Sequence, residues 1–113
     1  MSTIFKKIID KEIKSDIIYE SDKIISFKDI NPIAPIHLLI IPKKEIPTVN
    51  DIQEDDKILI GEMFIAAKEI AKLLKINNNG YRLIINCNDD GCQSVYHLHM
   101  HMLGGKKLNW KEL

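Results

Sequence analysis

The 113-residue sequence predicts a single α+β domain, in which an antiparallel sheet of about five strands carries one long and one short helix. Three observations support this prediction. Apolar residues recur at helical spacing in one long and one short segment, the other apolar residues form short β-prone runs, and the order is helix, strands, helix, strands without a repeat. A chain of this length, with 45% hydrophobic residues, can bury one core. We therefore expect residues 1–113 to form one domain.

The first expected element is a short helix, which Ser2 or Thr3 would cap and which would run through Glu12. Its apolar residues recur at helical spacing on one side, and they are Ile4, Phe5, Ile8 and Ile9. A helix of this length is marginal in isolation. It must therefore pack against the rest of the domain.

Three β-prone segments come next. Residues 17–20 and 23–28 flank Ser21-Asp22, an arrangement typical of a β-hairpin. After two closely spaced prolines, residues 36–41 form a strongly apolar run. Pro42 stops this run, because proline cannot donate to the hydrogen-bond ladder of a sheet. The three segments predict three strands.

The long helix is expected to begin at the acidic residues 54–56, which suit the positive end of a helix dipole. Apolar residues then continue at helical spacing, namely Ile60, Met63, Ala67, Ile70 and Leu74. The run 77–80, Asn-Asn-Asn-Gly, tolerates left-handed backbone and ends the helix. Two further strands, 81–86 and 96–103, are expected on either side of a loop of residues 87–95.

The composition disfavours several classes of partner. Sixteen Lys and Arg balance 16 Asp and Glu, so nothing in the charge indicates binding to nucleic acid. The first ten residues lack the apolar core of a signal peptide, and no apolar run reaches the roughly 18 residues of a membrane span. The spacing of Cys87 and Cys92 matches neither a redox pair nor a four-cysteine zinc site. We expect a cytoplasmic protein with two free thiols and no membrane or nucleic-acid partner.

Three of the four histidines occupy alternate positions near the end of the chain, and they are His97, His99 and His101. A strand would place them on one face, as a solvent-facing strip, while Leu98, Met100 and Met102 would face the long helix. Three histidines at this spacing indicate a polar ligand rather than a purely structural role.

A phosphate suits this strip better than a metal ion does. At strand spacing the outer two histidines start roughly 13 Å apart, whereas zinc needs nitrogens at about 2.0–2.1 Å. A zinc site would have to combine two of them with His37 or Cys92, and this alternative stays open. Adjacent imidazoles can instead divide attack, charge neutralisation and proton delivery at a phosphate. The sequence therefore favours phosphate chemistry without a metal or other cofactor.

The loop before the histidines has the groups that a phosphate site needs. Residues 91–94, Gly-Cys-Gln-Ser, supply flexible backbone, a side-chain amide and a hydroxyl. The same residues would also suit an ordinary turn. Their place just before the histidine strip favours the functional interpretation.

Residues 97–103, His-Leu-His-Met-His-Met-Leu, resemble the signature of the histidine triad superfamily, and residues 91–105 are similar to its nucleotide-binding Hint branch of purine nucleoside phosphoramidases. Further matching segments are 29–32, 34–37, 41–44 and Trp110. Two residues depart from the pattern. Cys92 stands where the branch usually has glycine, and Glu45 stands where a histidine is often found.

The resemblance implies a role for each catalytic position. His99 would attack the α-phosphorus to give a nucleotidyl-histidine intermediate, which water then cleaves. His101 would contact the phosphoryl oxygens, and His97 and His37 would complete the proton network. Ser94 would hydrogen-bond the scissile group. A histidine rather than a glutamine at position 101 implies hydrolysis rather than nucleotidyl transfer.

The resemblance also implies a nucleotide-binding set. Asp29 would accept the ribose hydroxyls, while Asn86 and Gln93 would hold the phosphate region. The purine pocket would be formed by apolar residues, namely Ile4, Phe5, Ile8, Phe27 and Ile30. By periodicity alone each of these is equally well a core residue, so we expect the pocket to be one edge of the core.

The implied activity is the hydrolysis of purine nucleoside phosphoramidates, with a purine nucleotide such as AMP or GMP as the bound partner. The implied assembly is a homodimer joined across the long helix and the last strands. Two other functions remain open. One is a dinucleoside polyphosphate hydrolase built on the same triad, and the other is a nucleotide-binding regulatory module in which hydrolysis is incidental.

Overall fold

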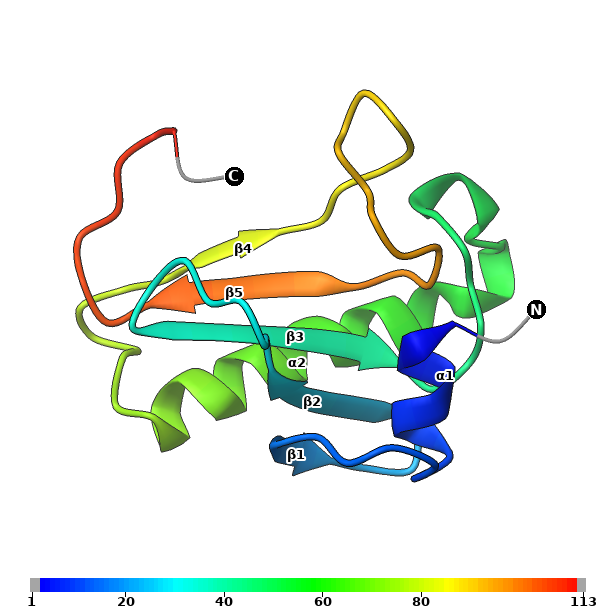
Figure 1. Cartoon of the computed structure of the whole chain (residues 1–113), viewed down its shortest axis with the longest axis horizontal. Helices are drawn as coiled ribbons and strands as arrows, with labels where there is room; N and C mark the ends of the chain where they lie inside the picture. Colours follow the sequence, from blue (N-terminus) through cyan, green and yellow to red (C-terminus); the bar gives the residue numbers. More distant parts are fainter. Residues whose placement is uncertain (1–2, 112–113) are drawn as a thin grey trace.

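Five strands form one antiparallel sheet in the order β1-β2-β3-β5-β4, as Figure 1 shows. The structure is a computed structural model, and it describes residues 3–111. Its strands are β1 (Ile17–Glu20), β2 (Ile24–Lys28), β3 (Ile36–Pro42), β4 (Arg82–Ile84) and β5 (Met100–Gly104). Its helices are α1 (Ile4–Ile9), α2 (Lys57–Leu73) and the 3-10 turns η1 (Val49–Asp51) and η2 (Glu54–Asp56). The predicted α+β class, with five strands, one long helix and one short helix, is confirmed.

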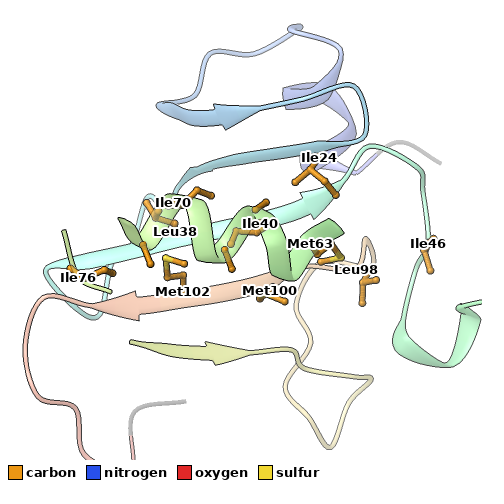
Figure 2. Close-up of a cluster of buried hydrophobic side chains, with 13 residues drawn as sticks. Ile24, Leu38, Ile40, Ile46, Met63, Ile70, Ile76, Leu98, Met100 and Met102 are labelled. Carbon is orange, nitrogen blue, oxygen red and sulfur yellow. The ribbon is translucent and has the colours of Figure 1, made fainter. Parts of the chain in front are cut away.

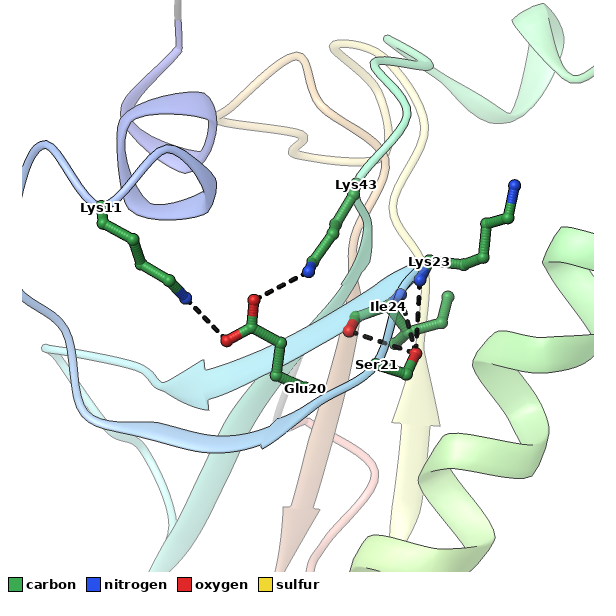
Figure 3. A network of polar contacts seen from close by, with 6 residues as sticks. All are labelled: Lys11, Glu20, Ser21, Lys23, Ile24 and Lys43. Atoms are coloured by element: carbon green, nitrogen blue, oxygen red, sulfur yellow. Dashed lines mark hydrogen bonds and ion pairs between the residues drawn. The ribbon is translucent and has the colours of Figure 1, made fainter.

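Local polar contacts fix the β1–β2 hairpin. The hydroxyl oxygen of Ser21 accepts from the backbone N–H of Lys23 and of Ile24, as Figure 3 shows. The carboxylate of Glu20 accepts from Nζ of Lys11 at 2.6 Å and from Nζ of Lys43 at 2.7 Å. The edge strand is therefore tied both to the segment after α1 and to the end of β3.

The main core lies between α2 and one face of the sheet. The apolar side chains of α2 meet those of β2, β3 and the β5 region, and Figure 2 shows them converging. The buried members include Ile24, Leu38, Ile40, Met63, Ile70, Leu98, Met100 and Met102. The predicted partition of residues 98, 100 and 102 toward the long helix is therefore confirmed.

A second, smaller cluster covers part of the opposite face. The short helix α1 packs there over β2 and β3, in front of the sheet in Figure 1. Its buried residues are Phe5, Ile8, Ile25, Phe27, Leu39 and Ile41. The expectation that the amino-terminal helix must pack is confirmed, and its packing leaves the His37–His101 end of this face for polar groups.

The bounds of both helices differ from the expectation. Thr3 caps α1 by accepting from the N–H of Lys6, while the alternative cap Ser2 lies outside the described residues. The helix ends at Ile9 rather than Glu12, because the backbone turns left-handed at Lys11, where φ is 62°. The acidic residues 54–56 form the turn η2, and α2 begins only at Lys57.

Both late strands are shorter than expected. The fourth strand covers residues 82–84 instead of 81–86, and the fifth starts at Met100 instead of Tyr96. The pairing of β3 with β5 ends at Ile40 and Met100, and residues 96–99 do not continue it. Leu98 donates its N–H to the carbonyl of Ile46 instead, at 2.7 Å. Within residues 3–111 no helix has the length and apolar character needed to span a membrane.

Candidate active site

The histidines gather on the face of the sheet that carries α1. His101 on β5 pairs with Leu39 on β3, and His37 on β3 pairs with Leu103 on β5, so both imidazoles lie on one face of neighbouring strands. The ring centroids of His37 and His101 are 5.2 Å apart, and those of His99 and His101 are 5.1 Å apart. The rings of His37, His99 and His101 thus form one cluster, and His97 adjoins it through its backbone carbonyl.

The expectation of a solvent-facing strip is wrong. His97 is 1% exposed and His99 is 4% exposed, because α1 and the segment after β3 cover them. Their surroundings lower the pKa of both imidazoles, chiefly by desolvation. Both rings are therefore neutral at pH 7.

Backbone geometry selects the tautomer of His99. Its Nδ1 lies 2.7 Å from the carbonyl oxygen of His97. A carbonyl oxygen can only accept, so this nitrogen carries the proton and donates it. Nε2 is then left unprotonated with its lone pair, which is the form that a nucleophilic imidazole needs.

His97 has the opposite tautomer, with its proton on Nε2. Its Nε2 donates to the carbonyl oxygen of Pro42 at 2.7 Å, which leaves Nδ1 unprotonated. That Nδ1 is buried and has no hydrogen-bond partner among the described residues. His97 contributes its backbone carbonyl to His99 and its ring to the attachment of this segment to β3.

His37 and His101 form a hydrogen bond in which one ring is the donor and the other is the acceptor. Nδ1 of His37 accepts from the N–H of Ile33 at 3.2 Å, so its proton is on Nε2. This Nε2–H faces Nδ1 of His101 at 3.0 Å, which makes that nitrogen an acceptor. The remaining proton of neutral His101 is therefore on Nε2, the nitrogen that does not face His37.

Asp29 stands beside this pair. Its Oδ2 is 3.4 Å from Nε2 of His37, and its Oδ1 accepts from the N–H of Asn31 at 2.8 Å. The carboxylate is 19% exposed beside an almost fully buried imidazole. Burial nevertheless lowers the pKa of His37, and it lowers the pKa of His101 to about 4. In the ligand-free protein both rings are neutral at pH 7.

Asp29, His37 and His101 also place one ligand atom each within 4.8 Å of one another, which is a geometry that a metal ion can use. The surroundings of His37 do not fit that role. A metal-bound imidazole donates the N–H of its other nitrogen, whereas Nδ1 of His37 accepts from Ile33. The donor set fits a hydrogen-bond relay better than a zinc site.

The expected purine-pocket residues separate into two groups. Phe5 and Phe27 make an edge contact, with centroids 5.6 Å apart, and Ile8 is buried with them. Ile4 and Ile30 are exposed, and Ile30 is 84% exposed. The first group is part of the core, and the second is available to a ligand at its border.

The loop before the histidines is organised by Gln93. Its amide Nε2 donates to the carbonyls of Pro47 and Val95, and its Oε1 accepts the N–H of Asn88. These bonds use both amide protons, so Gln93 holds the shape of the loop. The left-handed backbone at Asn88 and Cys92, with φ of 60° and 63°, belongs to the same tight turn.

Two other predicted residues flank this loop. Ser94 directly follows Gln93 and is exposed, and Asn86 is half-buried just beyond β4. Neither side chain has a hydrogen bond among those found in residues 3–111. Both remain available to a ligand at the ends of the loop.

The sequence interpretation missed the backbone groups that set the histidine tautomers. These groups are the carbonyls of Pro42 and His97 and the N–H of Ile33. No side-chain pattern identifies them, because they belong to the main chain. Pro42, which the sequence predicts to stop this strand, also supplies the carbonyl acceptor for His97.

The chain is similar to known proteins in both sequence and structure. Residues 10–108 match the model of the HIT domain family. The chain is 52% identical to a purine nucleoside phosphoramidase of Escherichia coli strain K12 over 94% of this chain and 89% of that protein. A HIT family hydrolase from Legionella pneumophila superposes with a TM-score of 0.94 at 44% identity, over 97% of this chain and 98% of that one. A histidine triad protein from Clostridium difficile gives a TM-score of 0.95 at 41% identity, over 99% and 97%.

Proposed function

Because this chain belongs to the HIT domain family, we propose that it is a hydrolase that cleaves purine nucleoside phosphoramidates into a nucleoside monophosphate and an amine. The observation that carries the proposal is the state of His99. Its Nδ1–H is committed to a backbone carbonyl, its Nε2 lone pair is unused, and a second imidazole lies 5.1 Å away between ring centroids. That arrangement suits nucleophilic attack on phosphorus with local proton transfer.

In the first step Nε2 of His99 attacks the α-phosphorus, and the bond from phosphorus to the amine nitrogen breaks. A bound phosphoryl anion favours protonation of His101, whose pKa is held at about 4 by burial and by the neighbouring His99 and His37. The Nε2–H of His101 then goes to the departing nitrogen, and Ser94 hydrogen-bonds the same group. The product of this step is a nucleotidyl-histidine and a free amine.

In the second step water attacks the phosphorus. One of its protons returns to His101, the phosphorus–nitrogen bond to His99 breaks, and the nucleoside monophosphate leaves. Nδ1 of His99 keeps its hydrogen bond to the carbonyl of His97 throughout, which spreads the positive charge of the intermediate into a backbone dipole. His37 and His97 complete the proton network around these two rings.

The nucleotide, AMP or GMP as the product, would lie along the same face. Asp29 would accept the ribose hydroxyls, and the apolar residues Ile4, Phe5, Ile8, Phe27 and Ile30 would contact the purine. Asn86 and the backbone of the loop shaped by Gln93 would hold the phosphate region. The exposure of Ile30 and the burial of Phe5 support a pocket at the border of the core.

A direct assay separates this function from its nearest rival. Adenosine phosphoramidate and a diadenosine polyphosphate would be offered to the purified protein under the same conditions. We expect faster cleavage of the phosphoramidate, and preference for the polyphosphate would favour the rival hydrolase. A role as a binding module requires that a folded His99 variant without turnover restores function in cells.

We further propose a homodimer located in the cytoplasm, with residues 1–113 as one domain in each subunit. Two features of the described chain support the dimer. β4 lies at an edge of the sheet, and α2 exposes apolar side chains, namely Ile58, Phe64, Ile65 and Leu73. Light scattering on the wild type and on Ile65→Glu tests this, because a dimer should dissociate in the variant and a monomer should not change.

A further inference from the structure

The ring of Phe5 lies against the histidines at the centre of the site. Its centroid is 5.0 Å from that of His99, with an interplanar angle of 83°, and 6.1 Å from that of His97, with an angle of 67°. Phe5 is 6% exposed, so these edge contacts lie inside the protein. A side chain from α1 thus forms part of the wall around His99.

Three groups confine the His99 imidazole. The carbonyl of His97 holds Nδ1, and the ring of His101 stands at 65° to the imidazole plane. Both come from the same segment of chain as His99 itself. Phe5 is the aromatic contact from a separate element, and it covers part of the His99 ring.

We propose that Phe5 is a positioning residue for His99, which it keeps dry and oriented with Nε2 toward the substrate. The proposal rests on the proposed role of His99 as nucleophile. Phe5 also contacts Phe27, the other aromatic of the proposed purine pocket, with centroids 5.6 Å apart. One ring therefore borders both the base site and the nucleophile, whereas Phe27 makes no ring contact with a histidine among the described residues.

This difference between two neighbouring phenylalanines supplies a matched pair of variants. Phe5→Leu and Phe27→Leu each remove one aromatic ring from the same apolar cluster with little loss of volume. Only Phe5→Leu removes the contact with His99. If Phe5→Leu does not fold by circular dichroism, Phe5→Met takes its place under the same criteria.

The first measurement uses the ligand-free protein and does not depend on activity. Imidazole nitrogens are followed by NMR through a pH titration of the wild type and both variants. In Phe5→Leu the pKa of His99 should rise toward the ordinary value of about 6.5, because water reaches the ring. In Phe27→Leu it should stay at the wild-type value. An unchanged pKa in Phe5→Leu, or an equal rise in both variants, overturns the proposal.

The second measurement is steady-state hydrolysis of adenosine phosphoramidate. Phe5→Leu should lower kcat at least about tenfold, since a misoriented nucleophile acts on the chemical step, while Phe27→Leu should mainly raise KM. If Phe5→Leu raises KM and leaves kcat unchanged, Phe5 only contacts the purine base, and the proposal is wrong. If the wild type shows no hydrolysis while the NMR shift appears, the proposed function fails, and only the shielding of the His99 ring by Phe5 stands.

Discussion

The proton positions at the site follow from single backbone atoms. One carbonyl oxygen decides that His99 is protonated at Nδ1, and one N–H decides that His37 is protonated at Nε2. A neutral imidazole presents one donor and one acceptor, so fixing one nitrogen fixes the other. The reactive lone pair of His99 is thus determined by the main chain, not by a neighbouring acid.

Replacement of this nucleophile gives the most direct prediction. His99→Ala should retain the fold and nucleotide binding but lose nearly all turnover. Because the side chain is buried, the variant leaves a cavity, and its thermal midpoint should be measured with its kinetics. Residual activity within about tenfold of the wild type, or about 1.4 kcal/mol of barrier, would identify another residue as the nucleophile.

Asp29 gives a prediction about the ribose. A carboxylate that accepts both vicinal hydroxyls makes hydrogen bonds commonly worth about 1.5–3 kcal/mol each, so a 2′-deoxy substrate should bind or react more weakly. Asp29→Ala should erase this discrimination, mostly in substrate binding. The exposed carboxylate of Asp22 provides the control, since Asp22→Ala should keep the discrimination. Equal behaviour of ribo and deoxyribo substrates in the wild type would remove the proposed orientation.

At the scale of elements, the sequence predicts segments better than their ends. Periodicity identifies α2 and β3 because each has a long apolar pattern, and the alternation at 97–102 correctly identifies residues 98, 100 and 102 as core residues. The ends depend on tertiary contacts. The segment 96–99 leaves the sheet because its hydrogen bonds go to Pro42 and Ile46, which lie 50 or more positions away in the sequence.

The candidate site follows the same division. The residue types and their clustering are visible in the sequence, because four histidines on two expected strands meet once β3 pairs with β5. Their burial is not visible, since it depends on α1 and on the segment after β3. The sequence also does not show that Gln93 holds the loop, because an amide side chain suits a phosphate contact and a loop contact equally well.

The loop before the histidines has a testable steric constraint. A Cβ at Gly91 would lie 2.6 Å from the carbonyl oxygen of Cys87 and 2.8 Å from its nitrogen, and both are backbone atoms that cannot rotate away. Gly91→Ala should therefore displace the loop and reduce kcat/KM by more than tenfold. Asp90→Ala, at an exposed neighbouring position, should have little effect. Wild-type activity in Gly91→Ala would separate the shape of this loop from catalysis.

For the whole molecule, the buried histidines predict a loss of stability in mild acid. The folded protein lowers the pKa of His37, His97, His99 and His101, so the unfolded chain binds more protons below about pH 6.5. The free energy of unfolding is then complete above that pH and declines as the pH falls toward about 4. Carboxylates with a lowered pKa, such as Glu20, reduce the free energy of unfolding only at lower pH, where they become protonated.

Thermal unfolding between pH 8 and pH 4.5 measures this dependence. His101→Gln removes one of the four titrating groups and should make the decline shallower than in the wild type. A decline of identical steepness in the variant would show that His101 does not contribute to it.

Metal removal is the second test on the whole molecule. Activity should survive exhaustive chelation, because Nδ1 of His37 accepts a hydrogen bond where a metal-bound imidazole would donate one. Elemental analysis of the purified protein accompanies the assay. Stoichiometric zinc, with inactivation on its removal and recovery on its return, would favour the metal site at Asp29, His37 and His101 instead.

The groups that accept the His97 and His99 protons have a consequence for the evolution of this site. They are main-chain carbonyls, which every amino acid provides, so no point substitution can delete them chemically. Substitutions at neighbouring positions can move these carbonyls only if they change the backbone conformation. Proteins that keep this backbone therefore keep the same protonation pattern of these two rings. Adaptation to new substrates then involves the side chains around them.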